Sequence, residues 1–155
     1  MAPKVAFRQL NEINAGEHDG MTYEEIAEQF PVDFAARDRD KLRYRYPSGE
    51  SYVDVCERLR DLLVVMNQSD NLLVISHQAV IRCIIAYLKK LPIEKLPYEK
   101  IPLHTLLKVT FDGNRNTVER YHLRVECVDT YRPKPSNCGN DRKFDDAIQT
   151  VPLHL

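Results

Sequence analysis

The residues best suited to chemistry lie where a short apolar run meets a histidine. Residues 72–75 (Leu-Leu-Val-Ile) predict a buried strand, because both faces are apolar, and Ser76 and His77 follow directly. A helix is predicted from Ala79, with Arg82 one turn inside it. Open α/β folds bind ligands at the carboxyl edge of the sheet, and the N–H groups of a helix N-terminus attract anions. A histidine, a helix N-terminus and an arginine therefore predict a phosphate site, although a purely structural histidine remains the alternative.

A second candidate for chemistry is the carboxyl group of Glu12. This residue lies just past another predicted strand, Lys4 to Leu10, so it too is expected at the edge of the sheet. A carboxyl group beside a phosphate could donate a proton to a leaving oxygen. On the residues alone, an exposed loop carboxylate is the simpler interpretation.

Three predicted helices surround these candidates. The first begins at Thr22, where Thr22 and Glu25 form a capping-box pair, and it ends at Pro31. The second covers residues 51–68, and the third covers residues 79–89. The apolar stripe of the second helix consists of Val55, Leu59, Leu62, Leu63 and Met66.

Two further segments complete the predicted domain. Residues 33–50 alternate charge and tyrosine without a clean period, which indicates a loop that covers something. Residues 104–111 and 117–124 could pair as a hairpin across the turn-prone Asp-Gly-Asn at 112–114. Strands that alternate with helices in this order imply an α/β layer fold.

The composition is that of one ordinary globular domain. The chain has 155 residues, 43% of them hydrophobic and 29% charged, with a formal net charge of −1. This balance gives no global attraction to nucleic acid or to an anionic membrane, so we expect neither as a partner. From Asp129 onward the chain is rich in Pro, Lys and Asp, so we expect a domain over residues 1–128 and a loosely packed tail over residues 129–155.

The apolar runs and the cysteines indicate a cytoplasmic protein. The longest apolar run is far shorter than the 18 or more residues that span a bilayer, and the first residues have no signal-peptide core. The four cysteines match no zinc-binding spacing. Cys56 and Cys83 fall on predicted core faces of helices, so we expect them to be reduced and buried rather than redox or metal groups.

Several ordered stretches of the chain carry a family resemblance. They are residues 10–16 (LNEINAG), 21–26 (MTYEEI), 40–52 (DKLRYRYPSGESY), 77–83 (HQAVIRC), 96–98 (LPY) and 102–105 (PLHT). These stretches resemble the phosphatase half of the bifunctional 6-phosphofructo-2-kinase/fructose-2,6-bisphosphatase family. The match covers roughly residues 8–111 without a break in register, and parts of residues 128–152 resemble the tail of that family.

The resemblance implies a fold and a set of site residues. The fold is the three-layer α/β histidine-phosphatase type, which is phosphoglycerate-mutase-like, and it would be incomplete because its first strand is missing. Glu12 takes the place of the proton donor to the leaving sugar oxygen, and His77 that of the histidine that stabilises the phosphoryl group in transit. The residues that match the family's sugar-bisphosphate ligands are Tyr23, Arg37, Lys41, Tyr52, Gln78 and Arg82. Without the resemblance, Arg37 and Lys41 would be interpreted as solvated loop residues and Tyr52 as a packing residue at a helix start.

The sequence departs from the family pattern in three places. Ser76 stands where the family usually has cysteine, a small-for-small change. The family's nucleophile is a histidine in an Arg-His-Gly sequence at the end of the first strand, and no Arg-His-Gly occurs here; His18, followed by Asp19 and Gly20, is no substitute. The ATP-binding Gly-x-x-x-x-Gly-Lys-[Ser/Thr] loop of a kinase half is also absent.

Three interpretations of function remain. The first is a truncated fructose-2,6-bisphosphatase, a hydrolase of fructose 2,6-bisphosphate in the control of glycolysis and gluconeogenesis, inactive without its nucleophile. The second is a non-catalytic module that binds fructose 2,6-bisphosphate or fructose 6-phosphate, or that associates with a full-length homologue. The third is another histidine phosphatase such as a mutase, and the set Tyr23, Arg37, Lys41 and Tyr52 speaks against it. The resemblance implies no cofactor and no metal ion.

The resemblance also carries an expectation about stability. In the family the nucleophile's strand lies beside the one that ends at His77. Its loss would expose the edge of the apolar residues 72–75, and such edges promote association. We therefore expect the chain to be marginally stable or to self-associate.

Overall fold

The computed structural model describes residues 4–68, 71–112, 115–127 and 129–134. The elements in chain order, with η marking 3-10 helices, are η1 (Arg8–Leu10), η2 (Gly16–His18), α1 (Tyr23–Gln29), α2 (Pro31–Arg39), α3 (Tyr52–Asn67), α4 (Gln78–Leu88), η3 (Ile93–Tyr98), β1 (Thr105–Asp112) and β2 (Arg115–His122). None of the helices within these ranges is both long and apolar enough to span a bilayer.

Side-chain caps fix the starts of two helices. At α1 the Thr22 hydroxyl accepts the N–H of Glu25 at 3.2 Å, and the Glu25 carboxylate accepts the N–H of Thr22 at 2.7 Å. Ser51 and Asp54 form the same reciprocal capping box at α3. The three helices predicted from the sequence are confirmed as α1, α3 and α4, with ends that differ by one or two residues.

The loop predicted over residues 33–50 is wrong for its first part, because α2 occupies residues 31–39. Pro31 stands in the first turn of this helix, where its fixed φ suits the helix and its missing N–H costs nothing. The buried positions of α2 are Phe34, Arg37 and Asp38, two of them charged. A helix that buries charged side chains has no apolar period, and this is why the sequence pattern did not reveal it.

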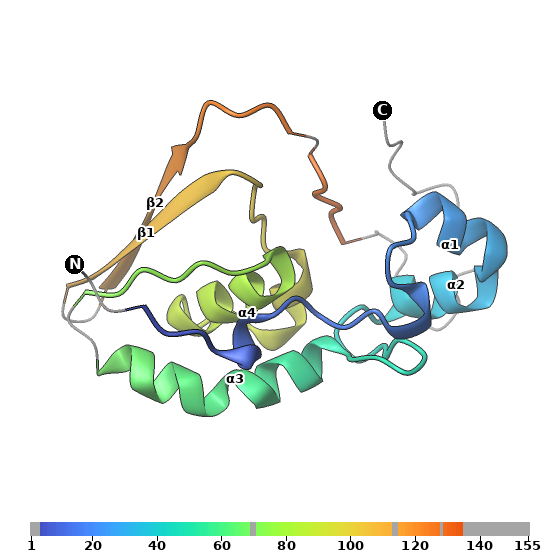
Figure 1. Ribbon diagram of the computed structural model, residues 1–155, viewed down its shortest axis with the longest axis horizontal. Helices are drawn as coiled ribbons and strands as arrows, with labels where there is room; N and C mark the ends of the chain where they lie inside the picture. Colours follow the sequence, from blue (N-terminus) through green and yellow to red (C-terminus); the bar gives the residue numbers. More distant parts are fainter. Residues whose placement is uncertain (1–3, 69–70, 113–114, 128, 135–155) are drawn as a thin grey trace.

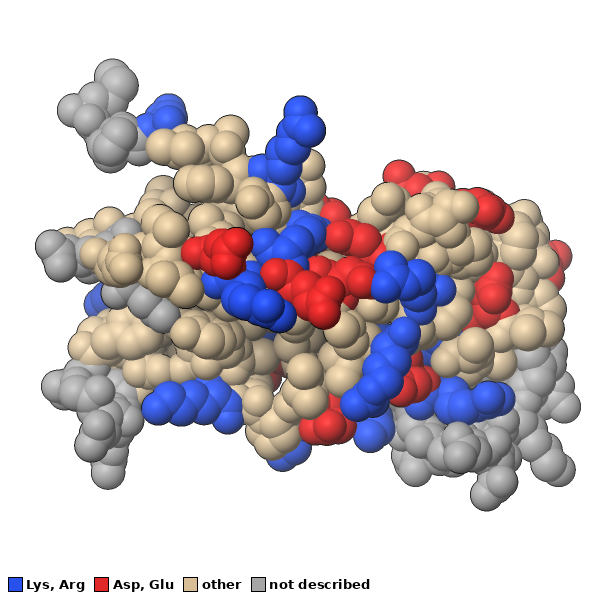
Figure 2. Space-filling view, turned by 90° about the horizontal axis from the view of Figure 1, so that it is seen from below, with Lys and Arg blue, Asp and Glu red and all other residues tan. Residues whose placement is uncertain are grey.

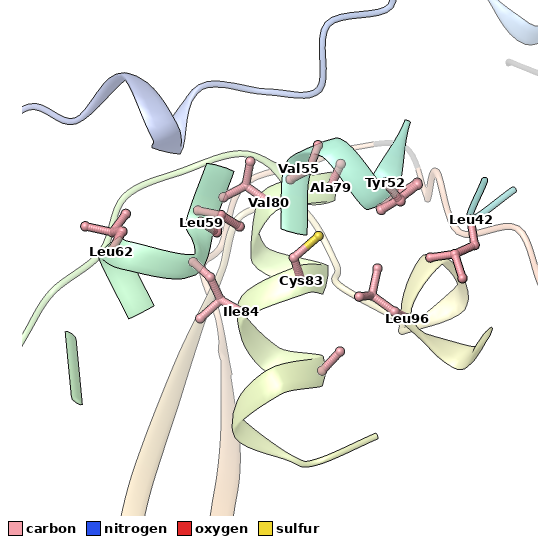
Figure 3. Packing of buried hydrophobic residues seen from close by; sticks show 11 residues of the cluster. Leu42, Tyr52, Val55, Leu59, Leu62, Ala79, Val80, Cys83, Ile84 and Leu96 are labelled. Carbon is pink, nitrogen blue, oxygen red and sulfur yellow. The ribbon is translucent and has the colours of Figure 1, made fainter. Parts of the chain in front are cut away.

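The main hydrophobic core lies between α3 and α4. Val55 and Leu59 of α3 are fully buried against Val80, Cys83 and their neighbours on α4. Figure 3 shows these side chains pointing toward one another from the two helices, with Leu96 of η3 beside them. The apolar stripe predicted on the second helix is therefore the face that builds the core. Cys56 and Cys83 are both free thiols of this region; Cys83 is buried and Cys56 is half-buried.

A second, smaller core belongs to α1 and α2. It consists of Ile26, Ala27 and Phe34, with Met21, Tyr23, Phe30 and Ala35 packed around them. His18 of η2 is buried at its margin, with its ring 4.6 Å from that of Phe30 and its Nε2 3.5 Å from a carboxylate oxygen of Asp33. In Figure 1 the two helices stand apart from α3 and α4, and residues 40–51 connect the two parts.

Of the residues described, only β1 and β2 form a sheet. They pair antiparallel, with Thr105 opposite His122 and Val109 opposite Val118, which confirms the predicted hairpin. The two other predicted strands are wrong. Residues 4–7 are extended but unpaired and lead into η1, and residues 72–77 are an unpaired extended run (Figure 1). A strand requires a hydrogen-bonded neighbour, and neither segment has one among the described residues.

An apolar groove of about 360 Å³ lies where a sheet neighbour would be expected. Residues 71–74 form one wall, β1 forms the other, and α4 contributes residues such as Ile81, Ile85 and Leu88. The side chains of Leu73 and Ile75 are 70% and 83% exposed, so the residues expected to be buried are open to solvent. The predicted tail begins at Asp129, of which residues 129–134 are described; the rest lies outside the described residues.

Candidate functional site

Three of the predicted ligand-binding cations are buried close together. Arg37 comes from α2, Lys41 from the turn that follows it, and Arg82 from the second turn of α4. All three side chains are buried, although Arg37 and Lys41 had been open to interpretation as solvated loop residues. A cation is costly to bury without a compensating partner, so the surroundings of each one decide what the cluster can do.

Arg37 is held by tyrosine hydroxyls. Its Nε donates to the hydroxyl of Tyr46 at 2.7 Å, and its Nη2 donates to that of Tyr23 at 3.1 Å. The guanidinium also lies 4.8 Å from the centre of the Tyr23 ring. The positive charge of Arg37 lowers the pKa of Tyr23, against the opposing effect of burial. Arg37 is thus oriented by two neutral groups that leave its charge uncompensated.

Arg82 is oriented in the same manner. Its Nη1 donates to the hydroxyl of Tyr52 at 2.9 Å, and its Nε donates to the carbonyl oxygen of Glu99 at 3.0 Å. Burial raises the pKa of Tyr52 to about 12, and the nearby Arg82 opposes that effect only in part. Tyr52 therefore remains a neutral hydroxyl across the physiological pH range, able both to accept from Arg82 and to donate to a ligand.

Lys41 lies between these two arginines. Its Nζ donates to the carbonyl oxygen of Pro97 at 3.0 Å and lies 5.3 Å from the centre of the Tyr98 ring. Burial lowers the pKa of Lys41 well below its usual value, and the positive charges of Arg37 and Arg82 lower it further. The charges of both arginines thus act on Lys41, which links the three side chains electrostatically.

The charges of the buried residues do not balance. Among the residues that the structure describes, the buried charged residues are Arg37, Lys41, Arg82, Arg132 and Asp38, and both carboxylate oxygens of the partly exposed Glu24 are also inaccessible to solvent. Asp38 pairs with Arg132 at 3.0 Å. On the face drawn in Figure 2, by contrast, the Lys and Arg side chains are interleaved with Asp and Glu. Among the described residues the buried cations thus outnumber the buried carboxylates, and an anion is the ligand that would neutralise the excess.

Glu12 lies at the N-terminus of α4. Its carboxylate oxygens accept the N–H of Ala79 at 3.2 and 3.4 Å, and one of them also accepts the N–H of Ile13 at 2.9 Å. The helix N-terminus that the sequence assigned to a phosphate is thus occupied by a carboxylate of the chain itself. The positive end of the helix dipole favours either anion there.

His77 is close to this carboxylate but does not contact it in any recorded hydrogen bond. It is the N-cap residue of α4, is exposed, and caps no backbone N–H with its side chain. A Glu12 carboxylate oxygen lies 3.2 Å from the backbone nitrogen of Ala79. Because two residues of chain span at most about 7 Å, this carboxylate lies within about 10 Å of the His77 backbone.

The side chain of Gln78, the first residue of α4, contacts residues from later in the chain. Its Nε2 donates to the carbonyl oxygen of Ile101 at 2.7 Å and lies 3.0 Å from the hydroxyl oxygen of Thr130. The structure therefore brings Arg37, Lys41 and Arg82 together with Tyr23 and Tyr52, with Glu12 and His77 at the start of the helix that carries Arg82.

Sequence reasoning missed two residues of this region, Tyr46 and Arg132. Tyr46 lies inside a family-like stretch, so its contact with Arg37 could have been considered. Arg132 lies in the segment assigned to a loose tail, yet it is buried, with its guanidinium 5.0 Å from the centre of the Phe34 ring. Its charge contributes to the lowered pKa of Lys41. The composition of the tail gave no signal for it.

The chain is similar to known proteins over nearly its whole length. It is 48% identical over 152 residues to 6-phosphofructo-2-kinase/fructose-2,6-bisphosphatase 1 of Rattus norvegicus, which covers 98% of this chain and 32% of the relative. The 6-phosphofructo-2-kinase/fructose-2,6-bisphosphatase of Aquarana catesbeiana is also 48% identical, over 99% of this chain and 33% of the relative. The chain thus spans about a third of the length of these relatives, and the family resemblance is confirmed.

A solved structure shows a similar fold. The solved alpha-ribazole phosphatase of Shigella flexneri superposes with a TM-score of 0.65 at 19% identity, over 81% of this chain and 64% of that one. This likeness concerns the fold alone. The sequence profile described as the histidine phosphatase superfamily (branch 1) matches residues 2–124. The chain therefore belongs to the histidine phosphatase superfamily.

Proposed function

We propose that this chain is part of a fructose-2,6-bisphosphatase domain that binds fructose 2,6-bisphosphate or fructose 6-phosphate. The observation that carries the proposal is the buried, net-positive cluster of Arg37, Lys41 and Arg82, oriented by tyrosine hydroxyls. Arginine and lysine side chains neutralise a phosphate, and the hydroxyls of Tyr23 and Tyr52 can orient a sugar. The relatives named for this activity support the choice of substrate.

The resemblance assigns roles to the remaining site residues. In this proposal Glu12 is the proton donor to the leaving sugar oxygen, His77 stabilises the phosphoryl group, and Gln78 contributes a hydrogen bond to the ligand. A phosphoryl group can reach the N–H of Ala79 only after the Glu12 carboxylate leaves it. We therefore expect the carboxylate to move away from the start of α4 when a phosphate enters.

We further propose that these 155 residues bind but do not hydrolyse the ligand. They contain no Arg-His-Gly sequence, which in the family carries the nucleophile. Catalytic residues that act as a unit do not retain partial function when the nucleophile is lost. A non-catalytic sugar-phosphate-binding module, which could act on a full-length homologue, is the second candidate, and the same missing sequence favours it.

The first test is calorimetric titration with fructose 6-phosphate. Two or three charge-assisted hydrogen bonds of about 2 kcal/mol each correspond to a Kd on the order of 0.1 mM. Replacing a cation, as in R37Q or R82Q, should weaken binding about 30-fold, because about 2 kcal/mol is lost. R43Q is the matched control, since Arg43 is exposed and paired with Asp40, and its affinity should equal that of the unaltered chain.

Two comparisons make this test specific. Fructose without phosphate should not bind, because the cluster recognises an anion. Circular dichroism must show that R37Q and R82Q retain the helical content of the unaltered chain. Equal affinity of R43Q and R82Q for fructose 6-phosphate would overturn the assignment of the site.

The second test asks whether a phosphoenzyme forms. The folded chain is incubated with fructose 2,6-bisphosphate labelled at the 2-phosphate, and acid-labile label on the protein is measured. We expect none, because His77 and Glu12 have only supporting roles. Stoichiometric labelling that disappears in H77A would contradict this, because it would make His77 the nucleophile.

The proposal extends to the surroundings of the protein. The free thiols of Cys56 and Cys83 favour a reducing compartment, and we propose the cytoplasm. We also retain as a proposal the division into a domain at residues 1–128 and a tail at residues 129–155.

A further inference from the structure

One arginine outside the cation cluster holds the backbone that carries Glu12. Arg58, on α3, donates through Nη2 to the carbonyl oxygens of Asn11 at 2.9 Å and Glu12 at 3.2 Å. Its Nη1 donates to the carbonyl oxygen of Gln9. One guanidinium group therefore donates hydrogen bonds to three carbonyl groups within four consecutive residues.

Glu50 fixes the orientation of that guanidinium. Its two carboxylate oxygens accept from Nε of Arg58 at 2.8 Å and from Nη2 at 3.2 Å, a two-point ion pair between half-buried side chains. The same carboxylate accepts the N–H of Asn14 at 2.9 Å, and the N–H of Glu50 donates to the carbonyl oxygen of Asn14 at 2.8 Å. Arg58 and Glu50 thus hold residues 9–14 at both ends of the segment.

The approach of the two backbones is close enough to exclude a side chain. Gly16 has φ +55°, and a Cβ added to it would lie 1.9 Å from the carbonyl oxygen of Pro47. The segment that follows Glu12 therefore lies directly against the loop that carries Glu50. This contact leaves little freedom for residues 9–16 to shift relative to α3.

The arginine replaces hydrogen bonds that a sheet would otherwise supply. Backbone carbonyl groups require partners, and residues 9–12 pair with no strand among the described residues. A planar guanidinium presents five N–H donors in a fixed fork, whereas a lysine ammonium is a compact point charge that cannot span the same set. The Ser76 hydroxyl adds one further bond, to the carbonyl oxygen of Leu10 at 2.6 Å.

We propose that Arg58, oriented by Glu50, is the positioning residue that holds the Glu12 carboxylate at the N-terminus of α4. The backbone of Glu12 is fixed by Arg58, and its carboxylate reaches the N–H of Ala79 from that fixed point. Arg58 does not itself touch the cation cluster in any recorded contact. The importance of this position for catalysis rests on the proposed function, in which Glu12 is the proton donor.

The test follows the Ala79 amide by NMR in R58K, which keeps the charge and the aliphatic stem. At one fixed pH the Ala79 amide shift should differ between the unaltered chain and E12Q, because E12Q replaces the carboxylate that accepts this N–H. The same comparison between R58K and R58K/E12Q gives the Glu12-dependent change in the variant. We expect the Glu12-dependent change to fall to less than half in R58K. R60K, an exposed arginine of the same helix, is the matched control and should leave it unaltered.

A purely structural role would give a different pattern. The methyl resonances of Val55 and Val80 report whether the core is intact, and they should be unchanged in R58K while the Ala79 signal changes. If R58K does not fold, E50Q decides, because it keeps an acceptor oxygen but removes the ion pair; its Glu12-dependent change should be intermediate. If R58K folds and its Glu12-dependent change at Ala79 equals that of the unaltered chain, the proposal is overturned. If only E50Q folds, an unaltered change in E50Q has the same consequence.

Failure of the proposed function can be recognised separately. Fructose 6-phosphate should bind to R58K within twofold of the unaltered chain, because the cation cluster is intact. If the unaltered chain does not bind the ligand but R58K still loses the Ala79 signal, the proposed function fails and the positioning role stands.

Discussion

Lys41 has an exposed fraction of only 7%, and its ammonium group lies beside two arginines. In the folded chain, burial and like-charge repulsion both disfavour its protonated form. In the unfolded chain the ammonium group of Lys41 is free of this penalty. At a pH where the group is protonated in both the folded and the unfolded state, its charge therefore lowers the free energy of unfolding. Lys41, which is a phosphate ligand in the proposed function, therefore destabilises the folded chain when it is protonated.

This leads to a prediction for K41M. At pH 7 the variant should have a higher free energy of unfolding, because burial and the two arginines disfavour the charge of Lys41 by more than the roughly 1 kcal/mol that the bond to Pro97 contributes. Between the folded-state pKa of Lys41 and its unfolded-state value of 10.5, the unfolded chain binds the extra proton. The stability of the unaltered chain should therefore rise with pH relative to K41M, so that the advantage of K41M disappears.

Urea unfolding at several pH values from 7 to 10.5 measures this difference. K95M is the control, because Lys95 is exposed, and its stability should differ from that of the unaltered chain by the same amount at every pH. A K41M variant less stable than the unaltered chain at pH 7 would show that the hydrogen bond to Pro97 outweighs the burial of the charge.

At the scale of elements, the exposed run 72–77 and the free side of β1 present unpaired backbone groups around an apolar groove. Such edges template pairing with another chain. We predict that the isolated chain is marginally stable or self-associates. Where it self-associates, L73K/I75K should raise the monomer fraction, because a charge on an edge opposes strand addition. Sedimentation velocity over a range of concentrations measures this.

V64K is the matched control for the edge. Val64 is exposed on α3, away from any strand edge, and its replacement should leave the association unchanged. A monodisperse monomer of the unaltered chain with cooperative unfolding would contradict the prediction.

The helices were predictable because their signals are local. The capping pair Thr22–Glu25 and the apolar stripe of α3 act within a few residues, and the predicted helix ends were accurate to one or two positions. The strand predictions at 4–10 and 72–75 were wrong because pairing is not local. An apolar run becomes a strand only when a neighbour is present, and no neighbour is described here.

The site was predictable to a different extent. The family resemblance named Arg37, Lys41, Arg82, Tyr23 and Tyr52, and the structure places these residues close together. The residues alone would have left Arg37 and Lys41 in a solvated loop, because their partners lie elsewhere in the sequence, such as Tyr23 for Arg37 and Pro97 for Lys41. The contact of Glu12 with Ala79 could not be read from the sequence either, since 67 positions separate the two residues.

At the scale of the whole molecule, the cation cluster stands between the two hydrophobic cores, with Arg37 on the side of α1 and α2 and Arg82 on the side of α3 and α4. A phosphate held by both arginines is therefore a bridge between two parts that have separate apolar interiors. Binding would couple the unfolding of the two parts. A ligand at 100 times its Kd stabilises every species with an intact site by about 2.7 kcal/mol, and it does not stabilise a species in which either part has opened. Without ligand the two parts could open separately, whereas with ligand they would unfold together, so the metabolite itself would set the size of the cooperative unit.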